Sequence, residues 1–326
     1  MKFLKIFAFS ATFFLLLFIG CTGAEKTARD AEINEELKAV ISKLDNKVIG
    51  SLLSNDRGLV EIFMTNEFKE ASKGAIDTLY KDFQIAGIKP DHKVFTQYYI
   101  IKKETDSLKV TSKDAGVNTY SLSVYMPFKE NFMSLLLVDN GKDYFLLING
   151  YGKVDGEWKL NTMHFGEYTI GYKTAIEWYE KSLKEHNEGY LLDAVNSLLL
   201  SSRVAYPGGS IWEYSKAPEI KAFYTKTLQE ANKTYKFPIV IDTLETEPRI
   251  INISLKRLDN EYYPVIKYYT SVDLNDSIKA TNENTAMHNV MESICKGITK
   301  DSKYVYYIAI NNKGSFKKKE FVKEPN

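Results

Sequence analysis

The spacing of the apolar residues changes three times along the chain and constrains the fold more than any other feature of the sequence. Between residues 31 and 86 apolar side chains recur at intervals of three and four, as in amphipathic helices. Between residues 93 and 168 they alternate with polar residues, as in strands that bury one face. A second helical stretch (174–231) and a second alternating stretch (from 237, with one helix at 282–297) follow. Because helices and strands come in separate blocks, the sequence predicts an α+β protein.

Two turn sequences divide the first alternating stretch into consecutive strands. Asn140-Gly141 and Asp155-Gly156 lie between apolar runs, and residues of these types tolerate the positive φ angles of tight hairpin turns. Helices followed by such a meander of strands predict one α+β domain over residues 31–172.

The helices before the sheet and the closing strands YFLLINGYGKVDGEWKLNTMHF (144–165) resemble the NTF2-like superfamily, the cystatin-type cone. The resemblance covers residues 31–172 and depends on pattern rather than on fixed residues. It implies that helices pack into a curved sheet around a cone-shaped pocket. Some members of the superfamily use this pocket for catalysis, and many use it for binding or assembly.

The next segment, residues 173–232, is predicted to be helical. Thr174 and Glu177 form a capping box, and Gly189 separates two helices. The pair resembles one tetratricopeptide repeat, with Trp178 at position 4, Glu185 in place of the aromatic residue at position 11, and small residues at positions 8, 20 and 27 (Ser182, Ala194 and Ser201). Because a solenoid needs about three repeats, a single one predicts a helical hairpin that connects two domains. The alternative is a groove that binds a partner.

The C-terminal part of the chain is predicted to form a further unit. Residues 236–314 have the pattern of a small ββαβ domain, and residues 315–326 are basic and are expected to be a solvated tail. The length of the chain exceeds what one core usually supports, which also favours two or three domains.

The first twenty residues have the layout of a secretory signal. Lys2 and Lys5 give a positive start, residues 6–19 are almost wholly apolar, and Gly20 precedes Cys21. The apolar stretch is too short for a permanent membrane-spanning helix. We therefore expect a signal peptide over residues 1–20, followed by a tether over residues 21–30.

The stretch Phe18-Ile19-Gly20-Cys21 resembles a bacterial lipobox, with Phe18 where leucine is typical. The resemblance implies cleavage after Gly20 and acyl chains on Cys21 that hold the protein on a membrane of the cell envelope. Thr22, which is not the aspartate that marks inner-membrane retention in enteric bacteria, favours the outer membrane where the host has one. The alternatives are an ordinary cleaved signal, or a disulfide with Cys295, which lies in an apolar helical pattern and is expected to be buried.

The composition and the spacing of reactive residues exclude several kinds of function. Removal of residues 1–20 leaves the basic and acidic residues nearly balanced, which argues against a nucleic-acid partner. No glycine-rich phosphate loop lies between a predicted strand and a helix. The sequence predicts no metal site and no cofactor, because the histidines do not have the spacing of metal ligands (His92, His164, His186 and His288).

One histidine is a candidate catalytic residue. His164 is expected to share a sheet face with Trp158 and Leu160, and to point into the cone near Tyr98 or Tyr168. If an acid such as Asp82 oriented the imidazole, it could act as a general base near neutral pH. The alternative is a histidine at a strand end that is exposed or bonded to its surroundings.

Two functions follow from these features. The first is a non-enzymatic envelope lipoprotein that binds or scaffolds a ligand, with the membrane as one partner and another envelope protein as a second. The alternative is an envelope enzyme, a hydrolase or acid–base catalyst, that uses the cone pocket around His164. Pairs of adjacent tyrosines are expected to pack one ring into the core, or else to form an aromatic platform for a glycan or peptide (Tyr98-Tyr99, Tyr262-Tyr263, Tyr268-Tyr269 and Tyr306-Tyr307).

Overall fold

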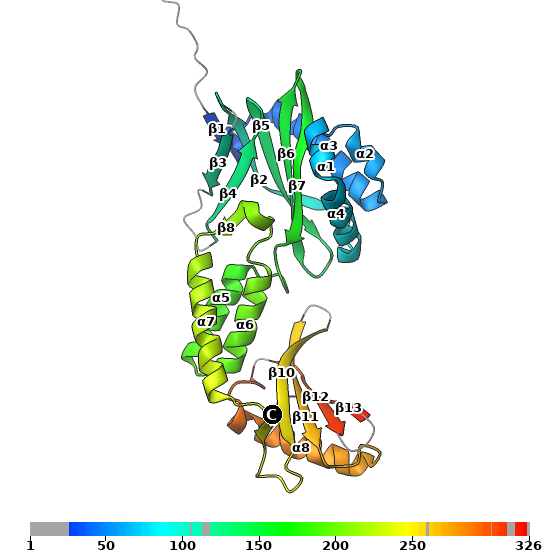
Figure 1. The fold of residues 1–326 in the computed structure, drawn as a ribbon, viewed down its shortest axis with the longest axis vertical. Helices are drawn as coiled ribbons and strands as arrows, with labels where there is room; N and C mark the ends of the chain where they lie inside the picture. Colours follow the sequence, from blue (N-terminus) through cyan, green and yellow to red (C-terminus); the bar gives the residue numbers. More distant parts are fainter. Residues whose placement is uncertain are drawn as a thin grey trace, which may run out of the picture.

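The chain is α+β, as predicted. The structure, a computed structural model, describes residues 26–104, 106–112, 118–258, 261–300, 302–311 and 317–324. A first sheet with its helices (26–167), three further helices (175–234) and a C-terminal sheet with one helix (239–323) follow one another along the longest axis (Figure 1). The predicted signal peptide and Cys21 lie outside the described residues. No helix in the described part is both long and apolar enough to cross a membrane.

Four helices precede most of the first sheet: α1 (Glu35–Ser54), α2 (Arg57–Glu61), α3 (Asn66–Ala71) and α4 (Lys73–Ala86). Asn34 begins α1, because its side chain accepts hydrogen bonds from two free N–H groups of the first turn. The helical spacing of residues 57–71 is typical of one continuous helix, but the structure has two short ones, α2 and α3. Phe63 and Thr65 exchange backbone hydrogen bonds with Leu160 of the sheet, at 2.8 and 2.9 Å, and therefore cannot continue the helix.

The first sheet is antiparallel, in the order β1 (Lys26–Arg29), β2 (His92–Ile101), β5 (Glu130–Asp139), β6 (Tyr144–Val154) and β7 (Glu157–Glu167). A short 3₁₀ helix, η1 (Asp30–Glu32), follows β1. The expectation of a tether up to residue 30 is therefore wrong for residues 26–29. These residues pair with β2, because Ala28 is buried and the Asp30 carboxylate accepts the Gln97 N–H at 2.8 Å.

Both predicted turns join neighbouring strands. Asp155 and Gly156 connect β6 to β7 with φ angles of 51° and 85°, as a tight hairpin turn requires. Residues 140–143 connect β5 to β6, and Gly141 has a φ of 83°.

A β-bulge changes which face of β7 each side chain occupies. Tyr151 pairs with Leu160 but Gly150 pairs with Thr162, so Asn161 is an extra residue in β7. Beyond the bulge Met163 and Phe165 join Trp158 and Leu160 in the hydrophobic cluster under α1 and α4. The expectation that His164 shares a face with Trp158 and Leu160 is therefore wrong, since one inserted residue turns His164 to the opposite face.

That opposite face is covered by a second sheet and by helices. The sheet has the order β3 (Asp106–Thr111), β4 (Tyr120–Met126) and β8 (Trp212–Tyr214), and the helices are α5 (Ala175–Asn187), α6 (Leu191–Arg203) and α7 (Ala217–Thr234). A 3₁₀ helix, η2 (Gly209–Ile211), leads into β8. Trp212 stacks on Tyr120 with ring centroids 3.8 Å apart. One cluster contains residues of the first sheet and of all three helices, so the segment predicted as a connector shares its core with the sheet.

The C-terminal unit is a sheet backed by a helix. The strand order is β13 (Lys317–Lys323), β12 (Val305–Asn311), β11 (Glu261–Thr270), β10 (Arg249–Leu258) and β9 (Ile239–Val240), and α8 (Ser277–Ile294) connects β11 to the parallel β12. Cys295, which follows α8, is buried, as predicted.

The expectation of a solvated tail over residues 315–326 is wrong for residues 317–323, because they form β13. Phe321 packs into the core under α8. Lys319 and Lys323 donate to hydroxyls of Ser277 and Thr285 at 3.0 and 2.8 Å, which holds the strand against the helix.

Candidate functional site

The structure does not assemble the predicted site around His164. His164 is half-buried beside Gly209, and burial lowers the pKa of its imidazole. Within the described residues it forms no hydrogen bond and no ion pair. Tyr98 and Tyr168 are buried in the core on that face, where the Tyr98 hydroxyl lies 3.3 Å from that of Tyr120. Burial also raises the pKa of Tyr168 to about 12, so this hydroxyl is not an acid near neutral pH.

The acid proposed as the partner of His164 lies on the wrong side of the sheet. Asp82 is on α4, and its neighbour Phe83 packs against Phe165 with ring centroids 5.1 Å apart. Phe165 follows His164 in β7 and therefore points to the opposite face. Asp82 cannot orient the imidazole, and the predicted pairing is wrong for this geometric reason.

A cavity of about 310 Å³ lies instead between the helix pair α5–α6 and the C-terminal sheet. Its first wall is formed by two stripes of side chains, one on each helix. Each stripe is continuous because residues three, four and seven apart share one face of a helix. α5 contributes Trp178, Lys181 and Glu185. The second stripe, from the residue before α6 to its third turn, comprises Tyr190, Asp193, Asn196, Ser197 and Leu200.

The C-terminal unit forms the second wall of the cavity. The hairpin of β10 and β11 contributes a mainly apolar and aromatic surface, and the chain after α8 adds small and polar residues. Ligand sites in proteins are commonly found between such units, in cavities of this size or larger. The lining residues of this wall are Leu255, Glu261, Tyr262, Tyr263, Pro264, Gly297, Ser302 and Lys303.

Charged groups of both signs line the cavity. Glu185 is only 5% exposed and forms an ion pair with Lys181 through one carboxylate oxygen. Its other oxygen is buried without a hydrogen-bond partner in the described part of the chain. The ammonium groups of Lys173 and Lys181 lie 5.2 and 5.9 Å from the ring centroid of Trp178, which places both cations beside that ring.

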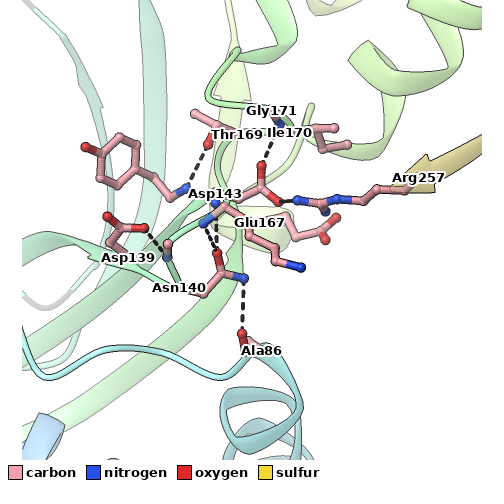
Figure 2. Close-up of polar contacts among 12 residues, drawn as sticks. Ala86, Asp139, Asn140, Asp143, Glu167, Thr169, Ile170, Gly171 and Arg257 are labelled. Atoms are coloured by element: carbon pink, nitrogen blue, oxygen red, sulfur yellow. Dashed lines mark hydrogen bonds and ion pairs between the residues drawn. The ribbon is translucent and has the colours of Figure 1, made fainter. Parts of the chain in front are cut away.

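An ion pair with a buried carboxylate joins the first sheet to the C-terminal sheet beside this cavity. Asp143, whose side chain is 1% exposed, pairs with Arg257 of β10. Its other carboxylate oxygen accepts the Gly171 N–H at 2.5 Å, and Gly171 itself lines the cavity. Figure 2 shows Asp143 between these two donors, with Arg257 reaching it from the C-terminal sheet.

The turn between β5 and β6 positions Asp143. The Asn140 side chain accepts hydrogen bonds from the N–H groups of Lys142 and Asp143 at 2.9 and 2.8 Å, and donates to the Ala86 carbonyl at the end of α4 (Figure 2). Tyr144 donates its N–H to the Thr169 hydroxyl. The turn is thereby fixed to α4 and to the chain that leaves β7.

A second set of contacts joins the helices to the C-terminal unit at another edge of the cavity. Lys300 donates to the Tyr190 hydroxyl at 2.6 Å, and Lys296 donates to the Glu188 carbonyl at 2.9 Å. Gly297 packs so closely on the Tyr190 ring that a Cβ atom at this position would overlap with the ring. Tyr190 and Gly297 both line the cavity, so these contacts are part of its wall.

The turn at residues 170–173 has a left-handed backbone conformation, and its Gly171 N–H is the donor to Asp143. Gly171 and Tyr172 have φ angles of 56° and 59°, and Ile170 and Lys173 exchange backbone hydrogen bonds. This conformation is unfavourable for residues with a Cβ atom. Glycine at position 171 therefore allows the backbone to present its N–H to Asp143 without strain.

We expect Gly171→Ala to lower the free energy of unfolding by about 1–2 kcal/mol, the usual cost of a left-handed non-glycine residue. Gly50→Ala is the matched control, because Gly50 lies within α1 and the space that a Cβ atom would occupy there is open. The control should raise the free energy of unfolding by about 0.5–1 kcal/mol. Urea denaturation of both variants measures the difference, and equal effects of the two substitutions would contradict the assignment.

The sequence contained one signal for this cavity. In the predicted resemblance to a tetratricopeptide repeat, Glu185 stands where an aromatic residue is typical, and this departure falls on a cavity-lining carboxylate. Asp143 and Arg257 carried no such signal. Comparison with protein-family models, with curated proteins and with solved structures gives no match.

Proposed function

We propose that this chain is a lipid-anchored binding protein of the cell envelope that holds a small polar molecule in the cavity between α5, α6 and the C-terminal sheet. The observation that carries the proposal is the cavity itself, which is lined by charged and amide side chains on successive helical turns. Hydrogen bonds from Lys300 and Lys296 join its two walls, and an ion pair beside it joins the first sheet to the C-terminal sheet. The NTF2-like and tetratricopeptide resemblances remain part of this proposal.

The packing of the helix pair favours a small ligand over a protein partner on this face. A groove that binds another protein would need the stripes of α5 and α6 to be open to solvent. Here β10 and β11 of the same chain cover them, and Leu255 and Tyr262 pack against the helical core. What remains is a cavity of small-molecule size that is partly open to solvent.

A cavity-filling substitution tests the proposal. Ser197 is 3% exposed and lines the cavity from α6. In Ser197→Leu the larger side chain fills space that a ligand would occupy. We expect a panel of amino acids, dipeptides, monosaccharides and dicarboxylates to contain molecules that raise the melting temperature of the wild-type chain. The same molecules should not stabilise the variant, whose circular dichroism should match the wild type. If no member of the panel stabilises the wild type selectively, the binding function is wrong.

The anchor requires its own test. We expect Cys21→Ser to abolish acylation, so the protein should move from the detergent phase to the aqueous phase and its N-terminal peptide should lose the mass of the acyl chains. A Thr22→Ser variant, which leaves the cysteine in place, is the control. Unchanged partitioning of Cys21→Ser would contradict the membrane address, and it would leave the cavity proposal untouched.

A further inference from the structure

We infer that the cavity accepts a small zwitterion, a free amino acid or short peptide, whose ammonium group meets Glu185 and whose carboxylate meets Lys173. This inference rests on the proposed binding function and specifies its ligand. The cavity lining contains three lysines and three acidic residues, so the two signs of charge balance (Lys173, Lys181, Lys303, Glu185, Asp193 and Glu261).

Glu185 supplies the site for a cationic group. One of its oxygens is engaged by Lys181, while the other is buried and accepts no hydrogen bond from the described residues. A buried carboxylate oxygen without a donor is costly, and an ammonium group offers three donors. A ligand ammonium group therefore completes the hydrogen bonding that the protein leaves incomplete.

Lys173 supplies the site for an anionic group. It lies at the cavity beside Trp178 and forms no ion pair within the described residues, unlike Lys181. A ligand carboxylate placed against Lys173 gains a charge-assisted hydrogen bond.

The α6 wall suits the polar atoms between the two charged ends of such a ligand. The side chains of Asn196 and Ser197 form no hydrogen bonds to described residues, and each can both donate and accept. An amide group of a short peptide has the same dual character.

Volume and charge separate this ligand class from the alternatives. A cavity of about 310 Å³ corresponds to about ten molecules of liquid water, which is the size range of amino acids and dipeptides. A dianion would be repelled by the acidic residues of the lining, and a polyamine would be repelled by its lysines. A neutral sugar would give Lys173 no anionic partner and would bring no cation to the second carboxylate oxygen of Glu185.

Isothermal titration of the full chain in detergent tests the inference. The titrants are the free amino acids and the dipeptides glycylglycine and L-alanyl-L-alanine, and for each that binds, its N-acetyl and its amide derivative. We expect removal of either charge to weaken binding at least tenfold. Equal affinity for the zwitterion and its N-acetyl derivative would overturn the inference.

Two substitutions assign the charged ends. Glu185→Gln should weaken zwitterion binding at least tenfold, whereas Glu180→Gln, an exposed change on the same helix, should leave it unchanged. Lys173→Gln, at an exposed position that should not affect folding, should lower the affinity for the zwitterion but not for its amide derivative.

The outcomes also distinguish the two proposals. If only a monosaccharide or a dicarboxylate binds, and Ser197→Leu removes that binding, the cavity function stands and the zwitterion is wrong. If neither these titrants nor any member of the thermal panel binds to the wild-type chain, both proposals fail. Binding of a zwitterion that survives Glu185→Gln, Lys173→Gln and Ser197→Leu would place it elsewhere on the protein and also overturn the inference.

Discussion

Arg257→Leu is expected to lower the free energy of unfolding by about 3–5 kcal/mol, because it leaves the charge of Asp143 buried without its partner. The Asp143 side chain is 1% exposed, whereas that of Arg257 is 28% exposed. Asp143 is therefore shielded from solvent, and a leucine at position 257 offers it no donor in place of the guanidinium. The Gly171 N–H remains as a donor, but one neutral hydrogen bond does not replace a guanidinium.

The double variant Asp143→Asn/Arg257→Leu separates the cost of the orphaned charge from that of lost packing. Asparagine retains a carbonyl oxygen for the Gly171 N–H and carries no charge, so the double variant should recover about half or more of the loss. Urea denaturation followed by far-ultraviolet circular dichroism measures the free energies of unfolding of the wild type, of Arg257→Leu and of the double variant.

Arg203→Leu is the matched control for this prediction. Arg203 pairs with Glu167 at 3.1 Å, but the two side chains are 47% and 30% exposed. Its removal should cost less than about 1 kcal/mol, as for other exposed ion pairs. If Arg257→Leu also cost less than about 1 kcal/mol, the ion pair of Asp143 and Arg257 would not hold the two units together.

Local features of the fold were predictable because neighbouring residues determine them. The capping box of Thr174 and Glu177 begins α5 as the sequence predicted, with the Glu177 N–H bonded to the threonine hydroxyl. Asp155 and Gly156 adopt the positive φ angles expected of their turn. In each case side-chain chemistry within a few residues decides the backbone conformation.

The features that the sequence did not predict depend on contacts between distant residues. Asp143 and Arg257 are 114 residues apart, and nothing near either one indicates a buried pair. Short strands such as β1 and β8 are stabilised by the strands beside them rather than by their own sequences. The bulge at Asn161 reversed the expected orientation of His164, since strand alternation predicts a face only while the register is unbroken.

The interior of the first unit provides a second large effect. Asp45 of α1 is 1% exposed, and one of its oxygens accepts hydrogen bonds from the Asn149 amide at 2.8 Å and the Tyr151 hydroxyl at 2.7 Å. Asp45→Ala leaves both donors buried without an acceptor. Near pH 4 we expect a loss of about 2–4 kcal/mol in the free energy of unfolding, at roughly 1–3 kcal/mol for each unsatisfied group. Asn46→Ala, an exposed change in the same turn, should alter it by less than about 0.5 kcal/mol.

Asp45→Asn should behave differently, because it keeps an oxygen for both donors and removes the titration. Burial raises the pKa of the Asp45 carboxyl, although the hydrogen bonds from Asn149 and Tyr151 act in the opposite direction. The folded state thus holds the proton more tightly than the unfolded state, where aspartate titrates near about 3.9. The stability that this group contributes is complete below that value and is lost as the pH rises through the raised folded pKa. Relative to wild type, Asp45→Asn should therefore gain stability between pH 4 and pH 7, as measured by urea denaturation across that range. If the difference in the free energy of unfolding between Asp45→Asn and wild type stayed constant with pH, the buried Asp45 carboxylate would be ionised at no cost. Asn149 and Tyr151 would then stabilise the charge as well as water does.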